Sequence, residues 1–163
     1  MKHFTTHRIA LSAIVAALYF AFTTLLTPIS YGPVQFRVAE ALCVLPFLFP
    51  ETAVGLFVGC ALANILGGYG LPDIVFGSLA TLIAGILTAK CRIKWLAPLF
   101  PVVINAVVVG AVLALSLVPE NPLGAFPLFA VEVGAGELGV VGIIGLPLLL
   151  GLERVIKKQE TRG

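Results

Sequence analysis

Charged side chains are scarce in this sequence, and their scarcity argues against an ordinary soluble domain. Only 11% of the 163 residues are charged, 60% are hydrophobic, and the mean hydropathy is +1.10. A soluble domain usually carries about a quarter of its residues as charged ones. We therefore expect lipid to be the solvent of this chain. One membrane span needs about 20 apolar residues, so five or six spans leave no room for a separate catalytic or nucleotide-binding domain.

Sequence signatures of catalysis and metal binding are also missing. The three cysteines, Cys43, Cys60 and Cys91, have no C-x-x-C spacing. Two of them lie in apolar runs, so we expect inert packing residues. The sequence contains no Walker A loop, no H-E-x-x-H and no paired-aspartate signature of membrane phosphotransferases. We therefore expect no catalytic residue, no metal and no cofactor, and ATP-driven work would need a partner protein.

Apolar runs separated by proline, glycine and charge predict an all-α integral membrane protein, a single transmembrane domain over residues 1–163. The predicted helices are approximately residues 9–27, 37–49, 52–66, 72–89, 95–118 and 134–156. The last apolar region, residues 124–152, exceeds one span. Because it contains prolines and glycines, its first ten residues are predicted to be a partly inserted loop or an irregular helix start, with a regular helix from about Gly136.

Basic residues predict the orientation of these helices. With six spans and a cytoplasmic N-terminus, every lysine and arginine except Arg37 falls on the cytoplasmic side, as the positive-inside rule expects. A five-span arrangement would place the four basic residues at the C-terminus outside. We therefore expect a multi-pass membrane protein with both termini in the cytoplasm.

Polar residues within or next to the apolar runs predict a substrate-binding pocket that opens to the outside. Such residues cost about 2.5–3.5 kcal/mol each on insertion scales and usually line a cavity or pathway. The candidates are Gln35, Arg37, Glu40, Asn64, Asp73, Asn105, Glu132 and Glu137. Asn105 lies ten residues into the fifth run, close to the midplane. Asn105, Glu132 and Glu137 have no local partner in the sequence, which favours ligand or gating work.

The other candidates have structural alternatives. Arg37 and Glu40 are three residues apart and could neutralise one another. Asp73 could cap the fourth helix. Asn64 could hydrogen-bond a neighbouring helix. These alternatives stay open at the level of the sequence.

Small residues recur at four-residue spacing along three of the predicted helices. The first helix carries Ala13, Ala17 and Ala21, the third carries Gly55, Gly59 and Ala63, and the fourth carries Gly77, Thr81 and Gly85. Such rows allow membrane helices to approach closely. They predict either packing within the bundle or docking onto another membrane protein.

Several of these motifs together resemble a known family. They are Q-F-R-x-x-E-A-L at residues 35–42, G-x-x-x-G-C-x-x-A-N at 55–64, D-x-x-F-G-S-L-A-T at 73–81 and the run GELGVVGIIGLPLL at 136–149. In this combination the chain is similar to the QueT family of S components, the substrate-binding subunits of energy-coupling factor (ECF) transporters.

The resemblance implies a six-helix protein that binds one micronutrient in an outward-facing pocket and is not itself an enzyme. Its partners would be a transmembrane coupling protein and two cytoplasmic ATPases, with no nucleic acid. In related S components an A-x-x-x-A pattern in the first helix contacts the coupling protein, and Ala13 and Ala17 match it. The implied ligand is a queuosine precursor: a 7-deazaguanine base such as the 7-cyano or 7-aminomethyl form, or queuine.

The chemistry of such a base suggests roles for the candidates. Glu132 or Glu137 would accept hydrogen bonds from its N1/N2 edge, and Asn105 and Asn64 would bind its carbonyl or ring nitrogens. The pair Arg37–Glu40 would hold the first loop. The ring could stack on one of four aromatic residues, Phe36, Tyr31, Tyr69 or Phe129. The alternatives are an S component for another vitamin, a small membrane enzyme using the two glutamates as an acid/base pair, and a homo-oligomeric pore.

Overall fold

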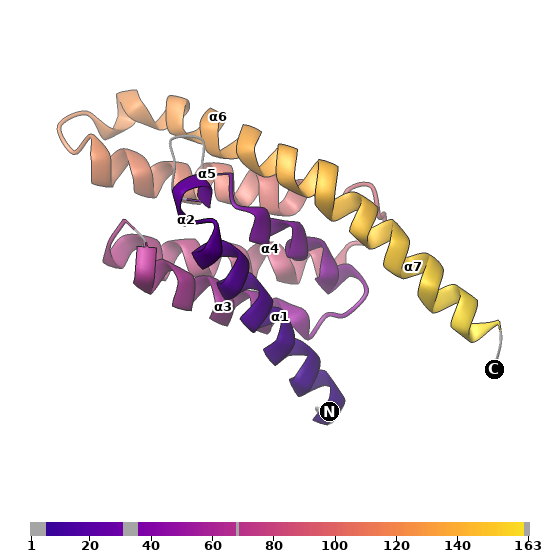
Figure 1. Ribbon diagram of the computed structural model, residues 1–163. Coiled ribbons are helices and arrows are strands. Elements are labelled where there is room, and N and C mark those ends of the chain that lie inside the picture. The colour runs from indigo at the N-terminus through magenta and orange to yellow at the C-terminus, as the bar shows by residue number, and fades with distance from the viewer. Residues whose placement is uncertain (1–5, 31–35, 68, 162–163) are drawn as a thin grey trace.

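Helices make up the fold of this protein. The computed structural model describes residues 6–30, 36–67 and 69–161, which contain no β-strand. The elements in chain order are α1 (Thr6–Leu25), α2 (Thr27–Ser30), the 3₁₀ helix η1 (Val38–Phe47), α3 (Thr52–Gly67), the π-helix η2 (Asp73–Gly77), α4 (Ser78–Lys90), α5 (Leu99–Leu117), α6 (Pro122–Val140), the π-helix η3 (Val141–Gly145) and α7 (Leu146–Glu160) (Figure 1). The prediction of an all-α membrane protein is confirmed.

Four helical stretches in the described residues are long and apolar enough to cross a membrane. They are α1, the joined η2 and α4, α5, and the continuous rod formed by α6, η3 and α7. Two apolar helices, η1 and α3, are shorter. The count of six spans stays a prediction, because it requires these two short helices to cross as well.

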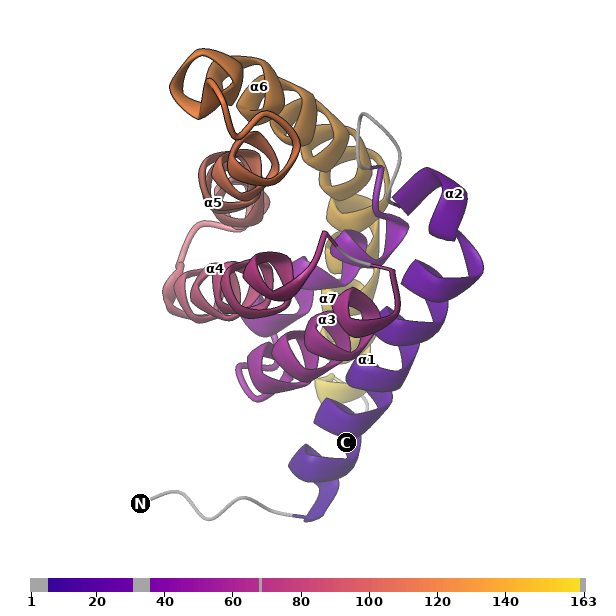
Figure 2. The same cartoon turned by 90° about the vertical axis from the view of Figure 1, so that its left-hand side faces the viewer.

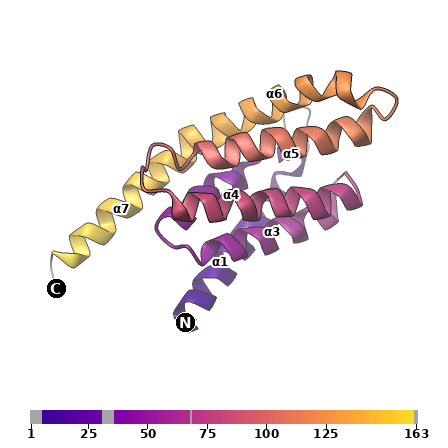
Figure 3. The same cartoon turned by 180° about the vertical axis from the view of Figure 1, so that it is seen from behind.

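The longer helices surround η1. In Figure 2, α6, α5, α4, α3 and α1 follow one another around an arc, and η1 lies inside it. Seen from behind, α4 and α5 lie side by side with α6 next to α5 (Figure 3). The central helix η1 contacts α1, α3, α4, α6, α7 and η3. A side chain on η1 can therefore reach residues from almost the whole bundle.

The central helix η1 is buried and has the 3₁₀ form. Every residue from Ala39 to Pro46 is buried. Because Pro46 lacks a backbone N–H and lies inside this helix, regular α-helical bonding is disfavoured there. A 3₁₀ helix rises about 2.0 Å per residue, so ten residues reach as far as a longer α-helix would. The sequence predicted this helix at residues 37–49 without its 3₁₀ form.

Residues 124–135 form regular α-helix, and the predicted irregular start of the last helix is wrong. α6 begins at Pro122, and the side chain of Asn121 accepts a hydrogen bond of 3.1 Å from the backbone N–H of Gly124. An asparagine cap followed by proline at the first helical position is a strong helix start. Pro127 lies inside the helix, where proline and glycine are better tolerated in membrane helices than in soluble ones.

Glycines bring α1 and α3 into backbone contact. A Cβ atom added to Gly55 would lie 2.1 Å from the carbonyl oxygen of Ser12, and one added to Gly59 would lie 2.6 Å from the carbonyl oxygen of Ala16. The small-residue row of α3 therefore serves packing within this bundle. The close approach also fixes the buried face of α1, which carries Tyr19, against the centre of the molecule.

Candidate functional site

Glu40 is the centre of a buried polar cluster. It lies in the first turn of η1 and is 1% exposed. Its Oε1 accepts a hydrogen bond from the hydroxyl of Tyr19, and its Oε2 accepts one of 2.8 Å from the thiol of Cys43. Tyr19 reaches the cluster because it belongs to the buried stripe of α1, one turn from Val15 and from Thr23. Both oxygens of Glu40 thus have a donor within the protein.

The thiol of Cys60 joins three elements beside Glu40. Its Sγ lies 3.8 Å from Nη1 of Arg37, 3.6 Å from Nδ2 of Asn64 and 3.4 Å from Oγ1 of Thr81. Arg37 precedes η1, Asn64 and Cys60 lie on one face of α3, and Thr81 lies on α4. All four residues are buried. The sulfur of Cys60 is therefore a shared contact of the arginine and the asparagine.

Asn64 and Asp73 meet over a glycine. Nδ2 of Asn64 donates a hydrogen bond of 3.0 Å to the backbone carbonyl of Asp73. A Cβ atom on Gly77 would lie 2.8 Å from Oδ1 of Asp73 and 3.1 Å from Nδ2 of Asn64. Gly77 thus leaves the space in which the fully buried carboxylate and the amide approach each other. Pro72, which precedes η2, makes no side-chain cap, and the capping role considered for Asp73 stays a prediction.

Asn105 and Glu137 form a second polar pair between α5 and α6. They are 2% and 6% exposed, and Nδ2 of Asn105 donates a hydrogen bond of 2.7 Å to Oε1 of Glu137. Oδ1 of Asn105 and Oε2 of Glu137 are buried without a hydrogen-bond partner in the described part of the chain. Because α5 begins at Leu99, Asn105 lies about 9 Å along this helix, nearer its start than the sequence suggested.

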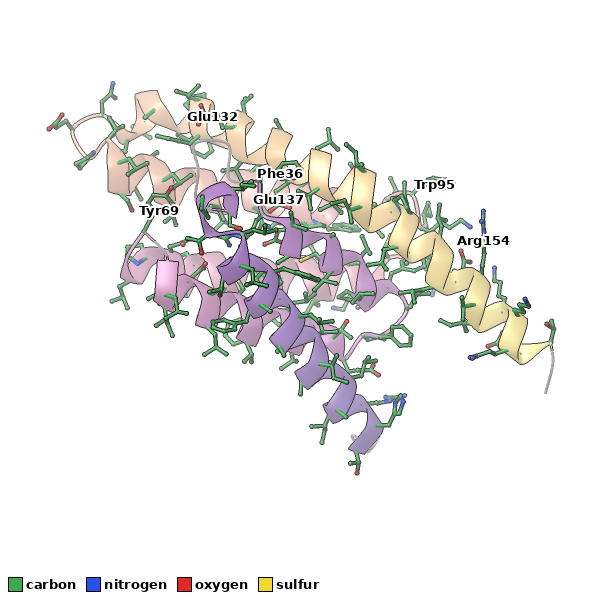
Figure 4. All side chains as sticks on the ribbon, in the orientation of Figure 1. Phe36, Tyr69, Trp95, Glu132, Glu137 and Arg154 are labelled. Carbon is green, nitrogen blue, oxygen red and sulfur yellow. The ribbon has the colours of Figure 1, made fainter. Side chains whose placement is uncertain are left out.

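This pair belongs to the same polar region as Glu40. The helix η1, which carries Glu40, contacts α6, which carries Glu137. A Cβ atom on Gly139 would lie 3.3 Å from a ring atom of Phe36, so the residue just before Arg37 lies against α6. Figure 4 labels Phe36 and Glu137 near the middle of the molecule. The site therefore combines carboxylates, amides and a guanidinium inside an apolar bundle.

Comparison with known proteins identifies the family of this chain. Residues 9–154 match the family model described as QueT transporter. This chain belongs to the QueT transporter family. The queuosine precursor transporter QueT of Lactococcus lactis subsp. cremoris is 40% identical to it over 85 residues, which are 51% of this chain and 50% of that protein. The alignment thus spans about half the length of this relative. No solved structure matches the chain.

In this QueT family member the fold brings together most of the predicted candidates. Six of them lie in the buried polar region just described: Arg37, Glu40, Asn64, Asp73, Asn105 and Glu137. Gln35 lies outside the described residues. Glu132 is half-buried and lies closer to the α5–α6 turn than Glu137 does (Figure 4). The roles of all eight in binding stay predictions.

Sequence reasoning missed the uncharged members of the cluster. Tyr19 and Thr81 were not proposed. Cys43 and Cys60 are free and pack in the buried core as expected, but their thiols also make polar contacts that the sequence did not indicate. A tyrosine or cysteine inside an apolar run is also common in an ordinary core. The available signal was the four-residue spacing from Cys60 to Asn64, which places both on one face of α3.

The described residues contain no group of three or more histidine, cysteine, aspartate or glutamate side chains that could hold a metal ion. The chemistry that these residues offer is hydrogen bonding and charge. It suits recognition of a polar organic molecule.

A separate apolar groove lies between α1 and α3 on the outside of the bundle. It has a volume of about 310 Å³ and is lined by Ile9, Ser12, Ala13, Ala16, Val54, Gly55 and Val58. Of the three alanines predicted for docking, Ala13 lines this groove, Ala13 and Ala17 are exposed, and Ala21 is half-buried. Their docking role stays a prediction.

Proposed function

We propose that this chain is the substrate-binding membrane subunit of an ECF-type importer that takes up a queuosine precursor. The observation that carries the proposal is the polar region between η1, α3, α5 and α6, which buries Arg37, Glu40, Asn64 and Glu137 in an otherwise apolar bundle. Placing so many ionisable and amide groups in a membrane protein is costly, and such groups usually serve a ligand or pathway. The Lactococcus relative is named as a queuosine precursor transporter, which supports the choice of ligand.

The proposed substrate is a 7-deazaguanine base, such as the 7-cyano or 7-aminomethyl form, or queuine. A guanine-like ring offers two N–H donors at its N1/N2 edge and an acceptor at its carbonyl. The site holds matching groups, with acceptors on Glu137 and Asn105 and donors on Arg37 and Asn64. The excess of carboxylates would also favour binding of a cationic aminomethyl group. Another vitamin with both donor and acceptor edges is the alternative.

The proposed partners are a transmembrane coupling protein and two cytoplasmic ATPases. The motifs of nucleotide binding are absent from the sequence, so ATP hydrolysis belongs to other subunits. The exposed alanines Ala13 and Ala17, next to the α1–α3 groove, support docking of a partner helix at this face. The proposed topology has six spans and both termini in the cytoplasm, which keeps the basic Lys90–Lys94 turn and C-terminus inside.

The test combines identification and binding. The chain is purified in detergent from cells grown with queuosine precursors, and mass spectrometry identifies the small molecule that is released on denaturation. Calorimetry on ligand-free protein then compares 7-deazaguanines with riboflavin, thiamine and biotin. We expect a 7-deazaguanine to be recovered unchanged and to bind most tightly. Tighter binding of another vitamin, or chemical conversion of the bound base, would contradict the proposal.

A further inference from the structure

Two buried acceptors in the polar region have no donor. Asn105 and Glu137 share one hydrogen bond, from Nδ2 to Oε1, and this leaves Oδ1 of Asn105 and Oε2 of Glu137 without partners among the described residues. A carboxylate can only accept, so the amide must turn its NH₂ group to Glu137 and its oxygen elsewhere. Buried acceptors left unpaired are costly. Two of them on one residue pair indicate that a donor comes from outside the chain.

An apolar cluster with two aromatic rings lies next to the pair. One turn nearer the α5–α6 turn, Asn105 is followed by Val109, and Glu137 is preceded by Val133. These two valines belong to one apolar cluster with Leu113, against which the rings of Tyr69 and Phe129 pack. The two valines therefore lie one helical turn from the two free acceptors, and the aromatic rings pack against the cluster to which these valines belong. Aromatic faces stack well on the rings of heterocycles.

Glu132 is less suited to the same task. It is five residues from Glu137, about 140° around the helix, and it is half-buried. Asn105 forms its hydrogen bond with Glu137 and not with Glu132. The pair between α5 and α6 therefore selects Glu137 from the two glutamates that the sequence left open.

We propose that Asn105 and Glu137 together read a pair of adjacent N–H donors on the ligand, with Tyr69 or Phe129 against its ring. The 2-amino group and the neighbouring ring N–H of a 2-aminopyrimidin-4-one supply such a pair, and 7-deazaguanines contain this ring. Asn105 then acts as an acceptor, the reverse of the role that the sequence suggested. This inference rests on the proposed function and adds which edge of the base is read and by which side chains.

The experiment removes the donor from the ligand and the acceptor from the protein. The full chain in lipid nanodiscs is titrated with 7-deazaguanine and with 7-deazahypoxanthine, which lacks only the 2-amino group. We expect the loss of this group to weaken binding about 10- to 100-fold, because it leaves a buried acceptor of the protein without a donor. In Glu137→Gln, we expect weaker binding of 7-deazaguanine and a difference between the two bases reduced to about threefold or less.

Two further variants complete the test. Glu120→Gln changes an exposed glutamate in the α5–α6 turn and serves as the control, with unchanged preference expected. If Glu132→Gln abolishes the preference while Glu137→Gln retains it, the assignment is overturned.

The comparison of the two bases on the unaltered protein tests the inference even if a variant does not fold. Equal binding of the two bases overturns the inference and leaves the proposed function standing. Binding of neither base, by protein that binds another vitamin, overturns both.

Discussion

At the residue scale, the buried carboxylate of Glu40 depends on a donor from a distant part of the chain. Tyr19 is 21 residues away in sequence, and its hydroxyl donates to Oε1 of Glu40. Both residues are almost completely buried. The hydrogen bond therefore connects α1 to the central helix η1 at the polar region.

Tyr19→Phe should weaken the fold. The change removes a single hydroxyl and leaves Oε1 of Glu40 buried without this donor, which typically costs about 1–3 kcal/mol. We expect a lower unfolding midpoint in detergent, measured by intrinsic fluorescence or thermal aggregation. Thr24→Val is the matched control, because the Thr24 hydroxyl is exposed on the same helix and bonds only the carbonyl of Phe20. Equal midpoints for the two variants would contradict the structural role of Tyr19.

The candidate site was partly predictable at this scale. Glu40, Asn64, Asn105 and Glu137 stand out because a polar residue inside an apolar run needs a reason. Their partners do not stand out, because the donor to Glu40 is Tyr19, a residue type common in any core. Only the packing of α1 on α3 and η1 reveals that contact. The pairing of Asn105 with Glu137 likewise joins two helices and leaves no local pattern.

At the element scale, the contact between α1 and α3 depends on Gly55, which has no side chain. The carbonyl oxygen of Ser12 lies 2.1 Å from the position where Gly55 would carry a Cβ atom. Backbone atoms cannot turn aside as a flexible side chain can. The two helices must separate if that position is filled.

Gly55→Ala should therefore destabilise the bundle, although alanine is the better helix former. Overpacking of this kind costs about 1–3 kcal/mol. Gly151→Ala is the control, since a Cβ there meets nothing within 4 Å, and it should leave stability equal or slightly higher. The unfolding midpoints of the two variants in the same detergent provide the measurement. A stable Gly55→Ala protein would show that α1 and α3 do not pack this closely.

The elements themselves were predicted unevenly. Pro50 lies between η1 and α3, and Gly67 is the last residue of α3, so these two residues mark helix ends. The prolines and glycines between residues 122 and 136 were misread as breakers, although Asn121 caps a helix that continues through Pro127. The 3₁₀ form of η1, in which Pro46 disfavours regular α-helical bonding, was not predicted, because hydropathy does not distinguish a 3₁₀ helix from an α-helix.

At the scale of the whole molecule, the outer face of α1 and α3 is the proposed contact with the coupling protein. Ala13 lines the groove between these helices, and Ala17 is exposed one turn further along α1. A large side chain at either position would fill the space that a partner helix needs. The proposed ligand site lies in the interior of the bundle, so ligand affinity should not depend on this face.

Ala13→Leu combined with Ala17→Leu should therefore separate assembly from binding. We expect less coupling protein to co-purify and uptake to fall by at least tenfold, with the affinity for 7-deazaguanine unchanged. Ala135→Leu, an exposed alanine on α6, should alter neither. If the double variant assembles normally, another face of the bundle carries the contact.

The rod formed by α6, η3 and α7 is too long to stand upright in a membrane. It runs over 39 residues, from Pro122 to Glu160, or about 58 Å at 1.5 Å per residue, against a hydrocarbon thickness of about 30 Å. The basic end of α7 can extend into water, but the remainder still has to lean. Because Glu137 is carried on this rod, its depth in the membrane follows the angle of the lean. Bilayers of different thickness would therefore hold the same carboxylate at different heights.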